Sequence, residues 1–198
     1  MKEFWDDRFS IEEYVYGTEP NTFFKSVIDE LVPGTILLPG EGEGRNAVYA
    51  ARLGWKVHAL DFSNAGKHKA MKLASEYQVE FEYDIGDLRY LEYNRKYDAI
   101  AVIFVHFPPE VRKSFHKKLI SALNTDGIIF IELFDKKQIK NNTGGPKDID
   151  MLNSVAELQN DFRDLDIRLI RNETVQILEG TYHSGQAEVV RMIAFKRF

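Results

Sequence analysis

Residues 35–46 read T-I-L-L-P-G-E-G-E-G-R-N. The apolar run at 35–38 predicts a short buried strand, and the glycines at positions 40, 42 and 44 predict a tight loop after it. Glycine lets the backbone turn sharply and approach a ligand closely. The alanine-rich segment that starts at Arg45 predicts a helix, whose first N–H groups have no partner within the helix. Strand, loop and helix together predict a cradle for a nucleotide-type ligand.

The next strand of this unit, at residues 56–60, ends at Asp61, 17 residues after Gly44. In open α/β folds an acidic side chain at this point accepts hydrogen bonds from the hydroxyls of a ribose. The simpler alternative is that Asp61 caps a helix that begins near Asn64. We predict Asp61 as a cofactor-binding residue.

Strand and helix patterns alternate through the first two thirds of the chain. After the two strands above, extended segments are predicted at 79–83, 98–105 and 128–134, with helical patterns before the first of them and between the last two. Strict alternation of this kind predicts a doubly wound parallel sheet. Two further extended segments, 167–178 and 187–195, are joined by a short connection, which makes them antiparallel neighbours.

The predicted fold class is therefore α/β: a doubly wound, mostly parallel seven-stranded sheet with an antiparallel C-terminal hairpin. We expect a single domain over residues 1–198. Its parts are an N-terminal aromatic lid and helix (1–34), a cofactor-binding half (35–134) and a substrate-side loop, helix and hairpin (135–198).

Composition narrows the class of protein. The chain has 198 residues, 44% of them hydrophobic, and a net charge of −5, whereas a dedicated nucleic-acid binder is usually basic. It has no cysteine, which excludes disulfides, metal sites with cysteine ligands and a cysteine nucleophile. No apolar stretch approaches the roughly 18 residues that span a bilayer, and the charged N-terminus lacks a signal-peptide core. We expect a cytoplasmic protein with a small-molecule substrate and neither a nucleic-acid nor a membrane partner.

Seven aromatic residues fall within the first 24 positions, about twice the density of the whole chain, which is 13% aromatic. One interpretation is that they pack the first helix, predicted to begin at residue 21 or 22, against the sheet. The other is a lid over the cofactor, whose aromatic wall would favour a cationic ligand group by about 1 kcal/mol. Arg8, Tyr14 and Tyr16 of this segment are predicted substrate-binding residues, together with Tyr182 near the C-terminus.

Four segments carry a resemblance to a known family. They are W-D-D-R-F with Y-V-Y-G and P-N (5–9, 14–17, 20–21), G-E-G-R-N-A (42–47), N-T-G-G-P-K-D (142–148) and E-G-T-Y-H-S-G (179–185). In these segments the chain resembles class I S-adenosylmethionine-dependent methyltransferases, and within them the small bacterial branch related to tellurite-resistance and thiopurine methyltransferases. The resemblance implies a Rossmann-like methyltransferase with S-adenosyl-L-methionine as cofactor.

The resemblance also assigns cofactor contacts. It places Gly40 and Gly42 beside the methionine portion and gives the ribose to Asp61. Leu38 stands where the family usually has an acidic residue, and we expect the loop carboxylate Glu41 to contact the cofactor's amino group in its place. The alternative is that this contact is absent or passes through water.

At the other end of the cofactor, the resemblance places Phe62 against the adenine, with Asp87 and Leu88 at the edge of the ring. Asp87 has a plainer alternative as a turn residue after Gly86. Phe104 is expected to point towards the transferred methyl group.

Arg45 begins the first helix of the glycine unit. It is a candidate for binding the cofactor carboxylate or a substrate anion, since guanidinium forks suit carboxylates, or it is a surface charge. Arg8 has the same alternatives.

Two histidines are candidate catalytic residues. His106 follows the fourth strand, where open α/β sheets place their ligands, and His183 lies in the predicted C-terminal turn. A histidine can take a proton from a hydroxyl, amine or thiol. The alternatives are a pocket-shaping role for His106 and a solvated turn residue for His183. The other histidines show no metal-ligand spacing, and no metal site is predicted.

The expected reaction is in-line transfer of a methyl group to a small nucleophile such as a thiol or a selenium or tellurium oxyanion. One alternative is an NAD(P)-binding oxidoreductase, because Gly42, Gly44 and Ala47 satisfy the looser dinucleotide fingerprint. Another is a non-catalytic S-adenosylmethionine-binding protein, which is favoured by Leu38 at the position where the family usually has an acidic residue.

Overall fold

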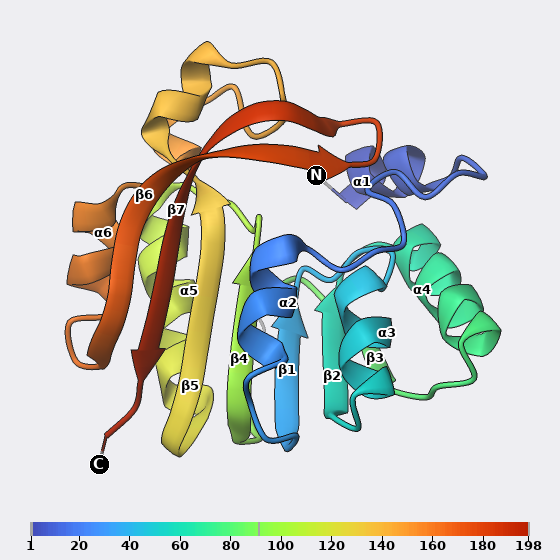
Figure 1. Cartoon of the computed structure of the whole chain (residues 1–198), viewed down its shortest axis with the longest axis horizontal. Helices are drawn as coiled ribbons and strands as arrows, with labels where there is room; N and C mark the ends of the chain where they lie inside the picture. The colour runs from blue at the N-terminus through green and yellow to red at the C-terminus, as the bar shows by residue number, and fades with distance from the viewer. Residues whose placement is uncertain (1, 91, 198) are drawn as a thin grey trace.

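The computed structural model describes residues 2–90 and 92–197, which form a three-layer α/β structure (Figure 1). The strands are β1 Thr35–Pro39, β2 Lys56–Asp61, β3 Glu82–Ile85, β4 Tyr97–Ile103, β5 Leu123–Phe134, β6 Asp166–Glu179 and β7 His183–Phe195. The helices are α1 Lys2–Phe9, α2 Thr22–Ile28, α3 Arg45–Arg52, α4 Asn64–Glu76, α5 Pro109–Ala122 and α6 Val155–Asp161, with short 3-10 helices η1 Lys136–Lys140 and η2 Ile149–Met151.

The strands form one seven-stranded sheet in the order β3-β2-β1-β4-β5-β7-β6. Strands β1 to β5 are parallel, and β7 pairs antiparallel with both β5 and β6. The prediction of a mostly parallel sheet with a C-terminal antiparallel hairpin is confirmed. Because parallel strands end at the same edge, the carboxyl ends of β1, β2, β4 and β5 lie side by side (Figure 1).

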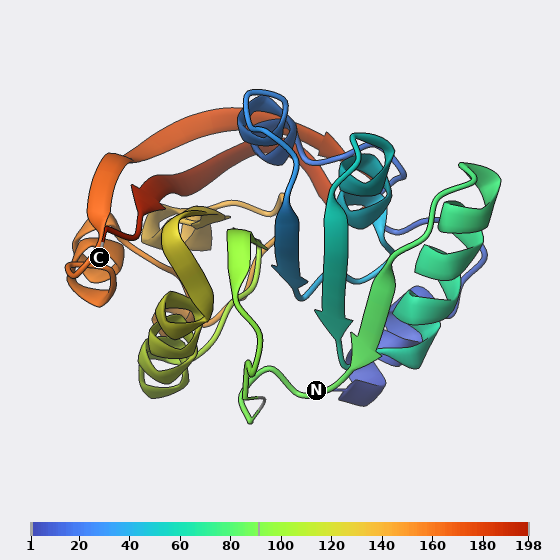
Figure 2. The ribbon, with the colours of Figure 1, turned by 90° about the horizontal axis from the view of Figure 1, so that it is seen from below.

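The sheet is covered on both faces (Figure 2). One face packs against α2 and α3 through a cluster that includes Phe24, Ala47, Ala50 and Phe130. The other face packs against α5 and α6, where Phe115 and its neighbours form the larger core cluster. Burial of this apolar surface supplies the main driving force for folding.

Several element boundaries differ from the predicted ones. Strand β3 was expected at 79–83 but begins at Glu82, because the Val79 N–H donates to the Ala74 carbonyl and holds the chain on the end of α4. The hairpin strands extend further than predicted, to Glu179 and from His183, since their ladder pairs continue to the turn. Residues 2–9 form α1, a helix for which the aromatic pattern gave no sign.

Candidate cofactor and acceptor site

A cavity of about 810 Å³ lies at the carboxyl ends of the parallel strands. It is roofed by α1, by the loop at 141–148 and by the turn of the β6–β7 hairpin. The predicted site residues that line it are Arg8, Tyr16, Gly40, Glu41, Gly42, Arg45, Asp61, Phe62, Leu88, Phe104, His106, Tyr182 and His183. The sequence-predicted site is thus brought together in one place, with two exceptions, Asp87 and Tyr14.

The glycine loop has the backbone that only glycine adopts readily. Gly40, Gly42 and Gly44 have φ values of 73°, 62° and 89°, in the left-handed region. A Cβ on Gly40 would lie 2.5 Å from a methyl carbon of Val105, and a Cβ on Gly44 would lie 2.6 Å from the Cβ of Ala70. The loop therefore passes close to both the segment that follows β4 and helix α4, and larger residues would displace it.

Asp61 fastens this loop to the end of β2. Its carboxylate accepts hydrogen bonds from the Gly42 N–H (3.1 Å) and the Ser63 N–H (2.9 Å). The side chain is buried, and this burial raises the pKa of Asp61 to about 6, while the backbone hydrogen bonds act in the opposite direction. Asp61 therefore orients the glycine loop and also presents a carboxylate to the cavity.

Glu41 supplies a second carboxylate on the loop. Its Oε1 accepts from the Ala47 N–H at 2.7 Å, so it caps the first turn of α3. Burial raises the pKa of Glu41 to about 8. Leu38, by contrast, is 2% exposed and belongs to the apolar core between the sheet and α3. The position where a carboxylate is expected is thus filled by packing, and the nearby acid comes from the loop; its contact with a cofactor stays a prediction.

Helix α1 lies over the glycine loop. Asp6 accepts hydrogen bonds from the Ser63 hydroxyl (2.7 Å) and the Ala65 N–H (3.3 Å), which fixes α1 to the start of α4. The hydroxyl bond lowers the pKa of Asp6. Phe9 is buried beside Gly42, and its ring stacks on Trp5 at a centroid distance of 5.4 Å.

The two candidate arginines differ in their partners. Arg45 forms an ion pair with Glu179 at 2.8 Å and donates to the Tyr16 carbonyl at 3.1 Å, so its charge is compensated within the protein. Arg8 donates to the Tyr16 hydroxyl at 3.0 Å and lies 4.4 Å from the ring centroid of Tyr182. Among the described residues no carboxylate pairs with Arg8. Arg8 is thus the better candidate for an anionic ligand group, whereas Arg45 is already paired within the protein; its contact with a cofactor stays a prediction.

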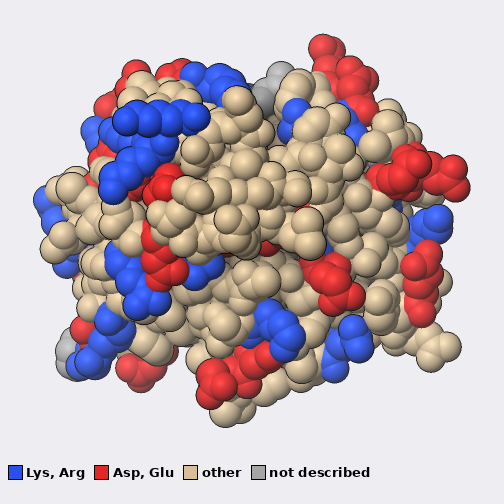
Figure 3. All heavy atoms as spheres, turned by 45° about the horizontal axis from the view of Figure 1, so that its top comes forward, with Lys and Arg blue, Asp and Glu red and all other residues tan. Residues whose placement is uncertain are grey.

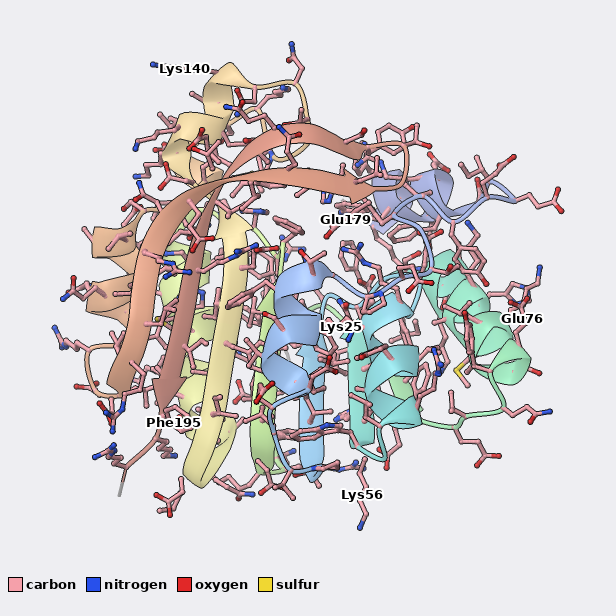
Figure 4. All side chains as sticks on the ribbon, viewed as in Figure 1. Lys25, Lys56, Glu76, Lys140, Glu179 and Phe195 are labelled. Atoms are coloured by element: carbon pink, nitrogen blue, oxygen red, sulfur yellow. The ribbon has the colours of Figure 1, made fainter. Side chains whose placement is uncertain are left out.

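A buried polar network joins the N-terminal segment to the hairpin, beneath which Glu179 is labelled in Figure 4. The Asn21 side chain donates to Glu132 (2.7 Å) and to Glu179 (2.9 Å), and the Asn21 N–H donates to Asn46 (2.9 Å). Burial alone would raise the pKa of Glu179, but its interactions with His183 and Arg45 hold it at about 2.

Glu43 of the glycine loop connects this loop to the N-terminal segment and to α4. Its carboxylate accepts from the Val15 N–H at 2.9 Å and pairs with Lys69 at 2.7 Å. Sequence reasoning did not single out Glu43, Glu179 or Asn21 for any role. One signal in the sequence could have found them. All three lie inside the segments that carry the family resemblance, and no helical or strand periodicity accounts for polar residues there.

Aromatic rings form the inner wall of the cavity. Phe104 stacks on Phe134 at 4.4 Å, and His106 stacks on the same ring at 5.6 Å with an interplanar angle of 16°. His183 contacts Phe104 edge-on at 4.8 Å, and Tyr16 lies 4.5 Å from His183. These five rings all line the cavity and form an aromatic chamber within it.

The two histidines of the chamber are held in different ways. His106 Nδ1 lies 3.1 Å from the Met151 carbonyl, and burial lowers the pKa of His106 to about 4. His183 Nδ1 lies 3.5 Å from the Glu179 carboxylate, and burial again lowers its pKa, although Glu179 acts in the opposite direction. His183 is buried in this environment, and the alternative of a solvated turn histidine is wrong.

Asp87 and Tyr14 are not among the residues that line the cavity. Asp87 pairs with Arg89, and this interaction lowers the pKa of Asp87. Leu88 alone of the predicted adenine-edge pair reaches the cavity. Tyr14 donates its hydroxyl to the Lys69 carbonyl at 3.2 Å and packs on α4. In this structure Tyr14 supports the N-terminal segment from outside.

The chain matches a known domain. A family model described as a methyltransferase domain matches residues 36–127, from β1 to the start of β5. A tRNA (uracil(54)-C(5))-methyltransferase of Pyrococcus horikoshii is 28% identical over 140 residues, which cover 64% of this chain and 33% of that protein. The chain thus spans about one third of the length of this relative.

Solved structures share the whole fold. TehB from Haemophilus influenzae superposes with a TM-score of 0.75 at 15% identity, covering 99% of this chain and 67% of TehB. Magnesium protoporphyrin IX methyltransferase from Synechocystis, solved with bound S-adenosylmethionine, gives 0.71 at 18% identity, with 98% and 94% covered. A structure from work on the conversion of a disulfide bond into a thioacetal group during echinomycin biosynthesis gives 0.82 at 14% identity, with 100% and 92% covered.

Residues 36–127 match a methyltransferase domain, and the whole chain has the fold of solved S-adenosylmethionine-dependent methyltransferases. S-adenosyl-L-methionine is the cofactor bound in one of these structures. The predicted resemblance, fold class and cofactor are confirmed at this level. Within residues 2–90 and 92–197, no helix is both long and apolar enough to cross a membrane.

Proposed function

We propose that the protein transfers a methyl group from S-adenosylmethionine to a small-molecule nucleophile by in-line displacement. The observation that carries this proposal is the continuity of the cavity. Both the glycine loop with Asp61 and the aromatic chamber line this one cavity, so a cofactor and an acceptor would meet inside it.

The residues around the glycine loop fit the cofactor. The loop at Gly40 and Gly42 leaves no side chain between backbone and ligand, and Asp61 offers a carboxylate for the ribose hydroxyls. Phe62 and Leu88 give the apolar surface that an adenine needs. Glu41 provides a carboxyl group beside the loop, and Arg8 provides a positive charge for a carboxylate. When bound, S-adenosylmethionine supplies an electrophilic methyl group on a positively charged sulfur.

The chamber contributes desolvation and alignment. A nucleophile that attacks a sulfonium methyl group neutralises charge in the transition state, so a dry apolar surrounding favours the reaction. The rings of Phe104, Phe134, Tyr16 and His183 exclude water and fix the approach of a flat or small acceptor. Fixing the two reactants in line removes much of the entropic part of the barrier.

A small acceptor is favoured over a nucleic acid. The cavity is roofed by α1, the loop at 141–148 and the hairpin turn, and the net charge is −5. On the face shown in Figure 3, acidic and basic side chains surround a centre without charged residues, and the basic ones gather most densely at the upper left. The tRNA methyltransferase relative shares only part of its length with this chain, and its substrate class is the alternative to be tested.

Methyl transfer from labelled S-adenosylmethionine to a panel of acceptors tests the proposal. The panel contains small thiols, phenols, selenite and tellurite, with unmodified tRNA as the competing acceptor. We expect labelled product with at least one small acceptor and none with tRNA. Binding of S-adenosylmethionine without transfer to any acceptor would contradict the enzymatic proposal, and transfer to tRNA alone would contradict the substrate class.

A further inference from the structure

Two buried ring nitrogens of the aromatic chamber have no hydrogen-bond partner among the described residues. One is His183 Nδ1, which lies 3.5 Å from the Glu179 carboxylate; the other is His106 Nε2. An unpartnered buried polar atom costs about 1–3 kcal/mol. His106 lines the cavity, so a molecule bound there can supply the missing partner.

The other ring nitrogen determines what that partner must be. The Met151 carbonyl, 3.1 Å from Nδ1, can only accept a hydrogen bond, so it places the proton of the neutral ring on Nδ1. The Asn153 amide nitrogen lies 3.4 Å from the same atom and donates nothing to a protonated nitrogen. Nε2 is therefore left as a lone pair, which needs a donor.

The surroundings keep His106 neutral. Burial is the main cause of its low pKa of about 4, and the neighbouring His183 of β7 acts in the same direction. Lys147 and Asp148 face the cavity from the loop at 141–148, and Glu41 and Asp61 face it from the glycine loop and the end of β2. None of these carboxylates forms a hydrogen bond to His106 in the described part of the chain, so a free Nε2 is present at neutral pH.

We propose that His106 Nε2 is the general base of the reaction, and that the acceptor is a flat apolar molecule carrying a protonated nucleophile, X–H. This inference rests on the proposed function and narrows its substrate class. The acceptor atom X forms a bond to the methyl carbon as the carbon–sulfur bond breaks, and its proton passes to Nε2. The products are the methylated acceptor, the neutral thioether and an imidazolium that returns its proton to water.

This assignment gives the two histidines different roles. His183 Nδ1 faces Glu179, whose charge is shared with Arg45 and Asn21, so its ring is oriented by the buried network. His183 then serves as a wall of the chamber. An acceptor that is already an oxyanion would face the lone pair of Nε2 with its own lone pairs, so the site favours a donor over an oxyanion.

The test compares acceptors that share one ring but differ in acidity. Para-substituted phenols and thiophenols, from weakly acidic parents to strongly acidic nitro derivatives, are methylated by the wild type, by His106→Asn and by His183→Asn. For weakly acidic acceptors we expect His106→Asn to lower kcat/KM by about 100-fold or more, the usual contribution of a general base. For the most acidic acceptors, which ionise without help, the loss should be less than about tenfold.

His183→Asn is the matched control, because it removes a chamber histidine that is not the proposed base. Its loss should be the same for every acceptor. An equal loss across the series for His106→Asn, or a dependence on acidity for His183→Asn instead, would overturn the assignment. Thermal unfolding and S-adenosylmethionine titration of both variants show whether the fold and the cofactor site are intact.

A second measurement does not depend on turnover. Nitrogen NMR of the labelled protein, assigned with His106→Asn, reports the protonation of each ring nitrogen. We expect the His106 ring to be neutral at pH 7, with the proton on Nδ1, and a cationic ring or a proton on Nε2 would contradict the proposal. Methyl transfer to selenite or tellurite alone would overturn the assignment of His106 as general base and would leave the proposed function intact. Transfer to no acceptor would contradict the proposed function itself.

Discussion

The platform and the cover of the cavity are built on different principles. The platform consists of β1, β2 and β4 with their loops, and its side chains are apolar and regularly spaced. The cover consists of residues 2–21, the loop at 141–148 and the hairpin turn around Glu179 and His183. It is held by buried ion pairs and hydrogen bonds between residues far apart in the sequence, up to 158 positions.

This difference shows how the site is stabilised. Apolar packing is roughly proportional to buried area and tolerates small changes. A buried ion pair adds little net stability when complete, but loses several kcal/mol when one partner is removed. The cover should therefore be more sensitive to single polar substitutions than the platform, and the variants below test this expectation.

The largest effect is expected for Glu179→Ala. It leaves the buried Arg45 guanidinium without its carboxylate and the Asn21 amide without one acceptor, so we expect a loss of about 3–5 kcal/mol in the free energy of unfolding. Urea denaturation measures it. Gln176→Ala, at an exposed position on the same strand, is the control and should change stability by less than about 0.5 kcal/mol. Equal effects for the two variants would mean that the network does not hold the cover.

Asp61→Ala should have the next largest effect, on cofactor affinity. If Asp61 binds the ribose through charge-assisted hydrogen bonds, its loss weakens S-adenosylmethionine binding by about 1–3 kcal/mol, as measured by calorimetric titration. Asp87→Ala is the matched control, because Asp87 is paired with Arg89 and does not line the cavity. A stronger effect of Asp87→Ala than of Asp61→Ala would assign the main cofactor contact to the β3 end of the sheet.

The platform was largely predictable from the sequence. Alternating apolar segments and helical patterns predicted the sheet and its hairpin, and the glycines with Asp61 predicted the ligand-binding edge. Each of these signals is local, since it depends on spacing within 20 residues or so. The start of β3 was misplaced because the hydrogen bond from the Val79 N–H to the Ala74 carbonyl is a capping detail that spacing does not reveal.

The cover was predictable only as a list of candidates. Tyr14 and Tyr16 are two residues apart, yet one packs outside on α4 and the other lines the cavity. Arg8 and Arg45 were equivalent in the sequence, and only the position of Glu179 distinguishes them. Contacts between distant segments carry no periodic signature, so the role of each polar residue here depended on knowing its partner.

Glu41→Gln tests the platform's own buried charge. Burial raises the pKa of Glu41 from 4.5 to about 8, so its stabilising contribution is complete below pH 4.5 and is lost as the pH rises through 8. Glutamine resembles the protonated acid at every pH. The variant should match the wild type below about pH 4.5 and be more stable by about 1–2 kcal/mol above pH 8. Thermal unfolding across this range measures the effect, with exposed Glu30→Gln as control; a difference independent of pH would contradict it.

The smallest effect is expected for Arg8→Leu, which tests whether the cover binds an anion. The guanidinium lies between the rings of Phe4 and Tyr182, each 4.4 Å from its centroid, and such cation–π contacts at exposed sites contribute about 0.5–1 kcal/mol. Stability should fall by no more than this. If Arg8 also binds the carboxylate of a ligand, affinity falls further for a ligand that has the carboxylate than for one that lacks it. Titration of the wild type and the variant with S-adenosylmethionine and with its decarboxylated form separates the two roles. An equal loss for both ligands would mean that Arg8 only ties α1 to the hairpin turn, so that the positive charge in the cover is structural.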